Sequence, residues 1–189
     1  MARKVQISKE VILKNAFEMV LQEGYASINI TSLAKKIGCS TQPIAWHFGN
    51  MEGLREDLFV YCLGFLRNNF SVEGDNTLDI LEGIASRYIK LAIEYPNLYK
   101  CLYMCEVDAD RIMSVAQELR AENLDRVRKI IMKEHGLSAE CTDKYLMDLQ
   151  LYVHGIASYA VTSVSHPSEE VLTQMIHNAN EAFLRFYKG

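Results

Sequence analysis

Apolar residues recur at intervals of three and four along most of the chain, which is the spacing of helices that bury one face. No stretch shows a convincing strand pattern, and only three prolines and ten glycines interrupt the helical one. The pattern predicts an all-α protein of about nine helices without internal repeats. The expected helices lie near residues 9–23, 32–37, 41–48, 51–68, 78–95, 98–107, 110–136, 139–166 and 169–188.

Polar residues mark the expected helix starts in the first quarter of the chain. Ser8, Thr31, Ser40 and Asn50 precede helical patterns, and their side-chain oxygens can accept hydrogen bonds from the first free N–H groups of a helix. Glycine ends the first two patterns, because it adopts positive φ easily. Three short helices are thus complete by residue 48, and a small three-helix head is expected. The fourth helix would run past that head.

Residues 31–48 contain two short helical patterns hinged at Gly38, Cys39 and Ser40. This is the spacing of a helix-turn-helix, in which the first helix braces the second and the second enters the major groove of DNA. The sequence therefore predicts a duplex-contacting head. The inward-facing residues of the pair would be Leu33, Ala34, Ile37, Ile44 and Phe48.

Charge is distributed unevenly along the chain. The formal net charge of -4 combines seven basic and four acidic side chains in residues 1–55 with a net charge of -7 in the remainder. A basic head on an acidic body suits a protein whose head contacts a polyanionic duplex. Chance fluctuation of a few charges is the alternative explanation.

The five cysteines are scattered, and no secretory leader pattern precedes the first helix. This favours reduced thiols and a cytoplasmic protein. The longest apolar-rich run, residues 145–164, contains Asp148, Gln150 and His154, which would be costly in lipid. A buried helix is expected there, with no membrane contact.

Thirteen residues spread over about 45 positions carry a family resemblance: Ala16, Phe17, Gly24, Thr31, Leu33, Ala34, Gly38, Ser40, Trp46, His47, Phe48, Glu52 and Leu54. In this arrangement the first 60 residues resemble the TetR family of one-component transcriptional regulators. The stretch 152–157 also looks like one found in the body of many members. The resemblance implies a DNA-binding domain at residues 1–50 and a helical effector-binding and dimerisation domain at 51–189. It also implies a homodimer that binds operator DNA and a small-molecule effector.

The residues expected to contact DNA lie in the arm and in the helix-turn-helix. Gln42 can pair with adenine, and Thr41, Pro43 and Ala45 offer apolar surface to thymine. Ala45 and Met51 stand where the family usually has Tyr and Lys, so two phosphate contacts of the family are missing. The full predicted set is Arg3, Lys4, Thr31, Lys35, Lys36, Ser40, Thr41, Gln42, Pro43, Ala45, Trp46, His47 and Asn50.

The residues expected to bind an effector are aromatic rings and methionines on body helices. By the resemblance, these helices would surround a cavity, and such walls suit an apolar or amphipathic molecule. The same spacing is equally that of a plain helical core. The predicted set is Tyr61, Phe65, Tyr88, Tyr95, Tyr99, Tyr103, Met104, Met113 and Tyr152.

The last two helices are rich in small residues and are expected to pair with their symmetry mates in a four-helix dimer interface. The predicted dimer contacts are Tyr152, Ile156, Ala157, Ala160, Met175, Ala179 and Phe183.

No arrangement of catalytic residues is visible in the sequence. Cys101 and Cys105 share a helix face, but no histidine stands at ligand spacing from them, so core thiols rather than a metal site are expected. No cofactor motif and no catalytic motif occurs, which argues against an enzyme. Two alternatives stay open: a helical adaptor whose head no longer binds DNA, and an all-helical enzyme with an unrecognised catalytic pair.

Overall fold

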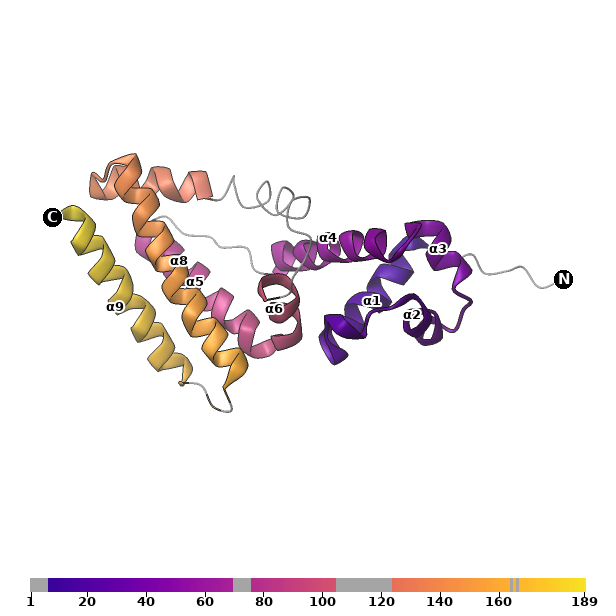
Figure 1. The fold of residues 1–189 in the computed structure, drawn as a ribbon. Helices are drawn as coiled ribbons and strands as arrows, with labels where there is room; N and C mark the ends of the chain where they lie inside the picture. The colour runs from indigo at the N-terminus through magenta and orange to yellow at the C-terminus, as the bar shows by residue number, and fades with distance from the viewer. Residues whose placement is uncertain (1–6, 70–75, 105–123, 164, 166) are drawn as a thin grey trace. The chain divides into compact units, whose positions relative to one another are not determined.

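The computed structural model describes residues 7–69, 76–104, 124–163, 165 and 167–189, and these residues form helices and connecting turns without a strand (Figure 1). The predicted all-α fold is confirmed. Residues 124–135 are also helical. The remaining elements are α1 (Lys9–Glu23), the 3-10 turn η1 (Tyr25–Ser27), α2 (Ile30–Ile37), α3 (Gln42–Phe48), α4 (Met51–Asn69), α5 (Thr77–Glu94), α6 (Pro96–Tyr103), α8 (Ala139–Thr162) and α9 (Glu169–Lys188).

The first of two compact units contains Met1–Asn69 and Tyr95–Val115. Helix α1 lies at its centre and packs against α2, α3, α4 and α6. This arrangement follows from the apolar face of α1, because Ile12, Ala16 and Val20 are completely buried. The other fully buried core side chains among the described residues of the unit are Leu33, Ile44, Leu54, Leu58, Cys62, Leu98 and Tyr99.

The second unit contains Phe70–Glu94 and Ala116–Gly189. Helices α5, α8 and α9 pack against one another and enclose its core. Ile131 and Tyr145 are completely buried there, and Ile176 nearly so. Helical spacing in residues 110–136 predicts Val115, Leu119, Val127, Ile130 and Ile131 as inward positions. Val127 and Ile131 are buried, Ile130 is half-buried, and Val115 and Leu119 lie outside the described residues. The predicted functional division at residues 50 and 51 stays a prediction.

Several helix starts agree with the sequence. The Ser8 hydroxyl accepts a hydrogen bond from the Val11 N–H, and Ser138 and Ser168 cap α8 and α9 in the same way. The Asn50 side chain accepts from the Gly53 N–H at the start of α4. These caps confirm that polar residues before an apolar pattern locate helix starts in this chain.

Two predicted caps are wrong. Helix α2 is capped by Asn29 rather than Thr31, because Asn29 and Ser32 exchange hydrogen bonds in a capping box. Helix α3 starts after Thr41 rather than Ser40, and its cap makes no side-chain hydrogen bond. Both helices keep their predicted places in the chain.

Two further expectations need correction. The helix expected at 98–107 starts at Pro96, because proline is well suited to the first turn, where no intrahelical N–H bond is needed. Helical spacing predicts an inward face of α9 made of Leu172, Met175, Ile176, Ala179, Phe183 and Phe186, but the Phe186 side chain is 74% exposed. The residue lies in the last turn of the final helix, where the described part of the unit has nothing to cover it.

Candidate nucleic-acid interface and ligand-binding residues

Helices α2 and α3 form the helix-turn-helix of the first unit. Gly38 ends α2 with φ 76° and ψ 34°, a left-handed conformation that glycine adopts without strain. The Cys39 N–H then donates to the Ala34 carbonyl at 3.0 Å, which closes the turn between the helices. Leu33 and Ile44 are completely buried and hold the pair against α1 and α4.

Helix α3 presents its outer face to solvent. Ile44 and Phe48 are buried, and Pro43 lies in the first turn, where its missing N–H breaks no helical bond. Thr41, Gln42, Ala45 and Trp46 are exposed, and Trp46 is 70% exposed. The predicted base-reading residues therefore lie together on one face of a short helix.

His47 and Asn50 already use part of their hydrogen-bonding capacity within the head. The His47 Nε2 lies 2.9 Å from the Ile7 carbonyl oxygen, and this oxygen can only accept. The contact places a proton on Nε2 and leaves Nδ1 for another partner. The Asn50 Oδ1 caps α4 through Gly53, which leaves the side-chain nitrogen of Asn50 as a donor for a phosphate.

The basic residues of the head differ in how they are engaged. Lys9 pairs with Asp57 at 2.7 Å and lies 5.4 Å from the centre of the Phe48 ring. Lys36 lies 3.9 Å from Glu18, at the long limit for an ion pair. Thr31, Lys35, Lys36 and Ser40 are exposed, whereas Arg3 and Lys4 lie outside the described residues.

Five of the predicted effector-binding residues are aromatic side chains of the first unit. Phe17 of α1 contacts Tyr61 and Phe65 of α4, with ring centres 5.5 and 4.9 Å apart. Phe65 also contacts Tyr95 at 5.7 Å, and the rings of Tyr99 and Tyr103 lie 5.2 Å apart on α6. Phe17, Tyr61, Phe65 and Tyr95 thus form connected ring contacts, and Tyr99 and Tyr103 form a further ring pair; we call these rings together the aromatic cluster of α4 and α6.

The other predicted effector-binding residues are dispersed. In the second unit the Tyr88 hydroxyl lies 2.7 Å from Nδ1 of His154, and Tyr152 contacts the Phe183 ring at 6.1 Å. Met104 is exposed, and Met113 lies outside the described residues. The effector-binding set as a whole stays a prediction.

Cys101 lies beside Cys62 in the core of the first unit. The hydrogen bond with the Cys101 thiol, followed by burial, raises the pKa of Cys62 well above its usual range. The Cys62 thiol is therefore protonated and unreactive at neutral pH. Cys105 lies outside the described residues, and within the described part no group of three His, Cys, Asp or Glu side chains could hold a metal ion.

The predicted dimer contacts divide by burial. Ala157, Ala160 and Ala179 are buried within the subunit, whereas Tyr152, Ile156, Met175 and Phe183 are half-buried. The exposed apolar side chains of α8 are Met147, Leu151 and Tyr159, and with Gly155 they form a row at intervals of four. Sequence reasoning missed this row, although its spacing was visible. We call it the α8 stripe.

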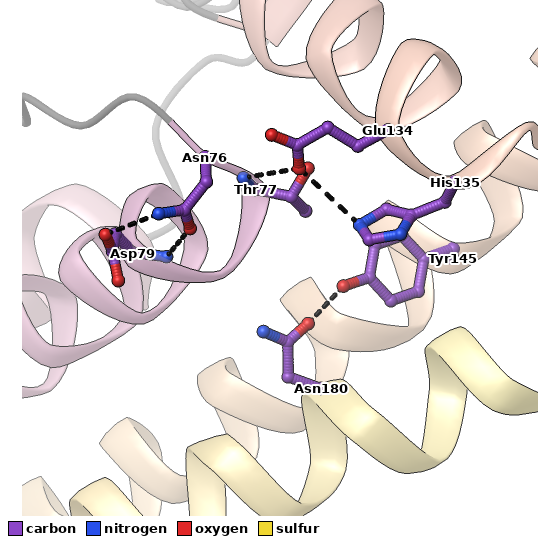
Figure 2. Close-up of polar contacts among 7 residues, drawn as sticks. All are labelled: Asn76, Thr77, Asp79, Glu134, His135, Tyr145 and Asn180. Carbon is purple, nitrogen blue, oxygen red and sulfur yellow. Dashed lines mark hydrogen bonds and ion pairs between the residues drawn. The ribbon is translucent and has the colours of Figure 1, made fainter.

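A polar cluster in the second unit was also missed (Figure 2). The Glu134 carboxylate accepts hydrogen bonds from the Thr77 side chain and from the Thr77 N–H, the latter at 2.9 Å, and these two contacts lower the pKa of Glu134. The Tyr145 hydroxyl donates to Oδ1 of the buried Asn180. Burial is the main cause that lowers the pKa of His135, and it is also the main cause that raises the pKa of Tyr145. No recognisable motif marks these residues in the sequence.

Among the described residues, none of the helices is both long enough and apolar enough to cross a membrane.

Comparison with protein-family models finds no match for the chain. In sequence, the chain is 24% identical over 131 residues to an uncharacterised HTH-type transcriptional regulator, YobS, of Bacillus subtilis (strain 168). The aligned region covers 65% of this chain and 69% of that protein.

Solved structures cover nearly the whole chain. A TetR-like transcriptional regulator from Rhodococcus sp. RHA1 matches with a TM-score of 0.69, 11% identity and coverage of 98% of both chains. A TetR variant from Acinetobacter baumannii AYE, solved in complex with minocycline, matches with a TM-score of 0.61 and 14% identity. That match covers 96% of this chain and 98% of the other. The resemblance carried by the first 60 residues is thereby confirmed, and the chain has the fold of the TetR-family transcriptional regulators.

Proposed function

We propose that the protein is a ligand-responsive, DNA-binding transcriptional regulator that acts as a homodimer. The proposal rests on the exposed face of α3. The turn at Gly38 and the buried side chains of Leu33 and Ile44 fix this helix in the head. The similarity to TetR-family structures and to an HTH-type regulator supports a DNA-binding regulator.

The exposed residues of α2 and α3 have different roles in this proposal. Gln42 reads adenine through its paired donor and acceptor, and Ala45 offers a methyl surface to thymine. Trp46, Lys35 and Lys36 contact the phosphate backbone, which supplies affinity without sequence preference. Ala45 and Met51 supply no phosphate contact, so Lys35 and Lys36 carry more of this binding.

The dimer follows from the geometry of DNA. Seven residues of α3 read too few base pairs for selectivity, and two heads on adjacent half-sites restore it. We place the dimer interface on the α8 stripe, because it is the exposed apolar row of a helix whose opposite face is already buried. The half-buried Tyr152, Ile156, Met175 and Phe183 would lie at its margin.

The effector is a small apolar or amphipathic molecule that shifts the dimer to a state with mismatched head spacing, so that the protein acts as a repressor released by its ligand. The aromatic cluster of α4 and α6 supports this, because aromatic walls with hydroxyl groups suit such a molecule. The Acinetobacter neighbour was solved with minocycline, which supports a ligand-responsive body. The effect of the ligand equals its differential affinity for the two states.

Selection of bound duplexes from a random pool, followed by titration of the selected site, tests the DNA-binding proposal. Gln42→Ala should lower the preference for the selected base at one position by about tenfold, because a bidentate contact is lost. Lys36→Ala should weaken binding to all duplexes and reduce the salt slope by about one. Gln22→Ala, in the exposed last turn of α1, is the matched control and should change neither value.

The alternative is a helical adaptor that no longer binds DNA. In that case the pool would yield no enriched sequence even at low salt, and Gln42→Ala would behave like Gln22→Ala. The proposal would then be abandoned.

A further inference from the structure

A cavity of about 230 Å³ lies in the second unit. It is bordered by the start of α5, the end of the 124–135 helix, the first turns of α8 and the C-terminal half of α9. Its lining includes Glu181 and five residues drawn in Figure 2: Thr77, Glu134, His135, Tyr145 and Asn180. None of the residues predicted to bind the effector lines it.

Two polar atoms at this cavity have no hydrogen-bond partner among the described residues. They are Nε2 of His135 and Nδ2 of Asn180. Asn180 is 1% exposed. Nε2 of His135 lies 3.7 Å from the Glu134 carboxylate, which is too long for a hydrogen bond. Buried polar atoms are rarely left unpaired, so their convergence on one cavity points to an occupant.

The neighbouring contacts determine which hydrogen bonds these atoms can still make. The Tyr145 hydroxyl donates to Oδ1 of Asn180, so Nδ2 remains as a donor. Glu134 already occupies the N-terminus of α5 through the Thr77 N–H, which removes that end of the helix as an anion site. An occupant must therefore present an acceptor oxygen to Asn180.

Charge selects further among occupants. The carboxylates of Glu134 and Glu181 border the cavity, and the His135 imidazole is neutral at neutral pH because burial and Lys188 lower its pKa. Lys188 is the one cation that acts on this imidazole among the groups identified, and Glu134 and Glu181 oppose it. The balance of charge around the cavity therefore disfavours an anionic occupant and favours one with an N–H group that can donate to a carboxylate.

The volume sets the size of the occupant. It equals roughly eight water molecules at liquid density and lies below the range of drug-sized pockets. We infer that this cavity is a second small-molecule site, which takes a compact neutral or cationic compound with an acceptor oxygen and an N–H group. The inference is independent of the proposed DNA binding and of the aromatic cluster.

A nuclear magnetic resonance titration of the full-length chain with β-alaninamide tests the site. This compound carries an ammonium group and an amide oxygen and is small enough for the cavity. Saturable shifts are expected for the Asn180 side-chain amide and the Thr77 backbone amide, with a millimolar dissociation constant. Sodium acetate, an anion with an acceptor oxygen but no N–H group, should cause no saturable shift.

Variants connect the shifts to the site. Asn180→Leu removes the unpaired donor at similar volume and should weaken β-alaninamide binding about fivefold, read from the Thr77 backbone amide. Glu181→Gln, at an exposed position that tolerates change, should weaken it by a similar factor. Thr173→Val on the exposed face of α9 is the matched control and should leave binding unchanged.

Three results would overturn the inference. The first is the absence of saturable shifts at these two amides, as expected if water alone fills the cavity. The second is equal binding by wild type, Asn180→Leu and Glu181→Gln. The third is acetate binding as tightly as β-alaninamide.

Discussion

Asn29 and Ser32 show how single polar side chains determine a helix start. Each accepts a hydrogen bond from the other's N–H, at 2.8 Å and 3.3 Å, and α2 therefore begins two residues before the start that Thr31 would set. The sequence could not decide this, because Asn and Thr are both good caps and lie two positions apart. The chemistry of the side chains identifies the candidate cap residues, and the backbone conformation in the folded chain determines which of them caps the helix.

His135 makes the stability of the second unit depend on pH. Burial, followed by Lys188, lowers its pKa below the ordinary 6.5, so the unfolded chain binds a proton at a higher pH than the folded chain. The contribution of His135 to the free energy of unfolding is therefore fully present above about pH 6.5, and it is lost as the pH decreases toward the folded pKa. Urea titrations at about pH 7 and about pH 5.5 should show a smaller loss for His135→Gln than for wild type.

The matched variant is His177→Gln, on the half-exposed side of α9. Between the two pH values it should lose as much free energy of unfolding through His135 as the wild type does, because His135 is still present. An identical loss in wild type and His135→Gln would contradict the assigned pKa direction.

At the scale of elements, periodicity predicted where helices lie better than which of their faces is buried. The predicted α9 positions Leu172, Ile176 and Ala179 are buried, but Phe186 is exposed. On α8 the apolar residues surround the helix, and the exposed Met147 and Leu151 have the same spacing as the buried ones. A pattern that is apolar on two faces cannot show which face the subunit covers.

Two glycines of α4 form a matched pair. A Cβ atom added to Gly53 would meet the carbonyl oxygen of Phe48, whereas one added to Gly64 meets nothing within 4 Å. Gly53→Ala should lower the free energy of unfolding by about 1–3 kcal/mol, because backbone at the α3–α4 junction must shift. Gly64→Ala should raise it by about 0.5–1 kcal/mol through helix propensity. Urea denaturation measures both, and equal effects would disprove the close approach.

At the scale of the molecule, the proposed function requires two copies of the chain. A head with one short recognition helix carries little selectivity, and the α8 stripe is a row of apolar side chains that water covers in the isolated subunit. The two features are connected, because the dimer would fix the distance between its two heads.

Leu151→Glu should raise the dimer dissociation constant by at least about tenfold, because it places a charge in the centre of the α8 stripe. Sedimentation equilibrium measures this. Ile84→Glu is the matched control on α5, where an exposed apolar residue lies outside the stripe, and it should leave the dimer intact. A dimer that tolerates Leu151→Glu would move the interface elsewhere.

The sequence by itself determined the helical class, the places of the helices and the helix-turn-helix, because helical spacing, caps and glycine turns are local properties. Only the tertiary structure decided that Asn29 caps α2 and that Ala157 is buried while Leu151 is exposed. Only it brought Thr77, His135 and Asn180 to one cavity. These three residues are separated by dozens of positions in the sequence. Only the packing of the helices brings them together, and local sequence patterns do not predict that packing.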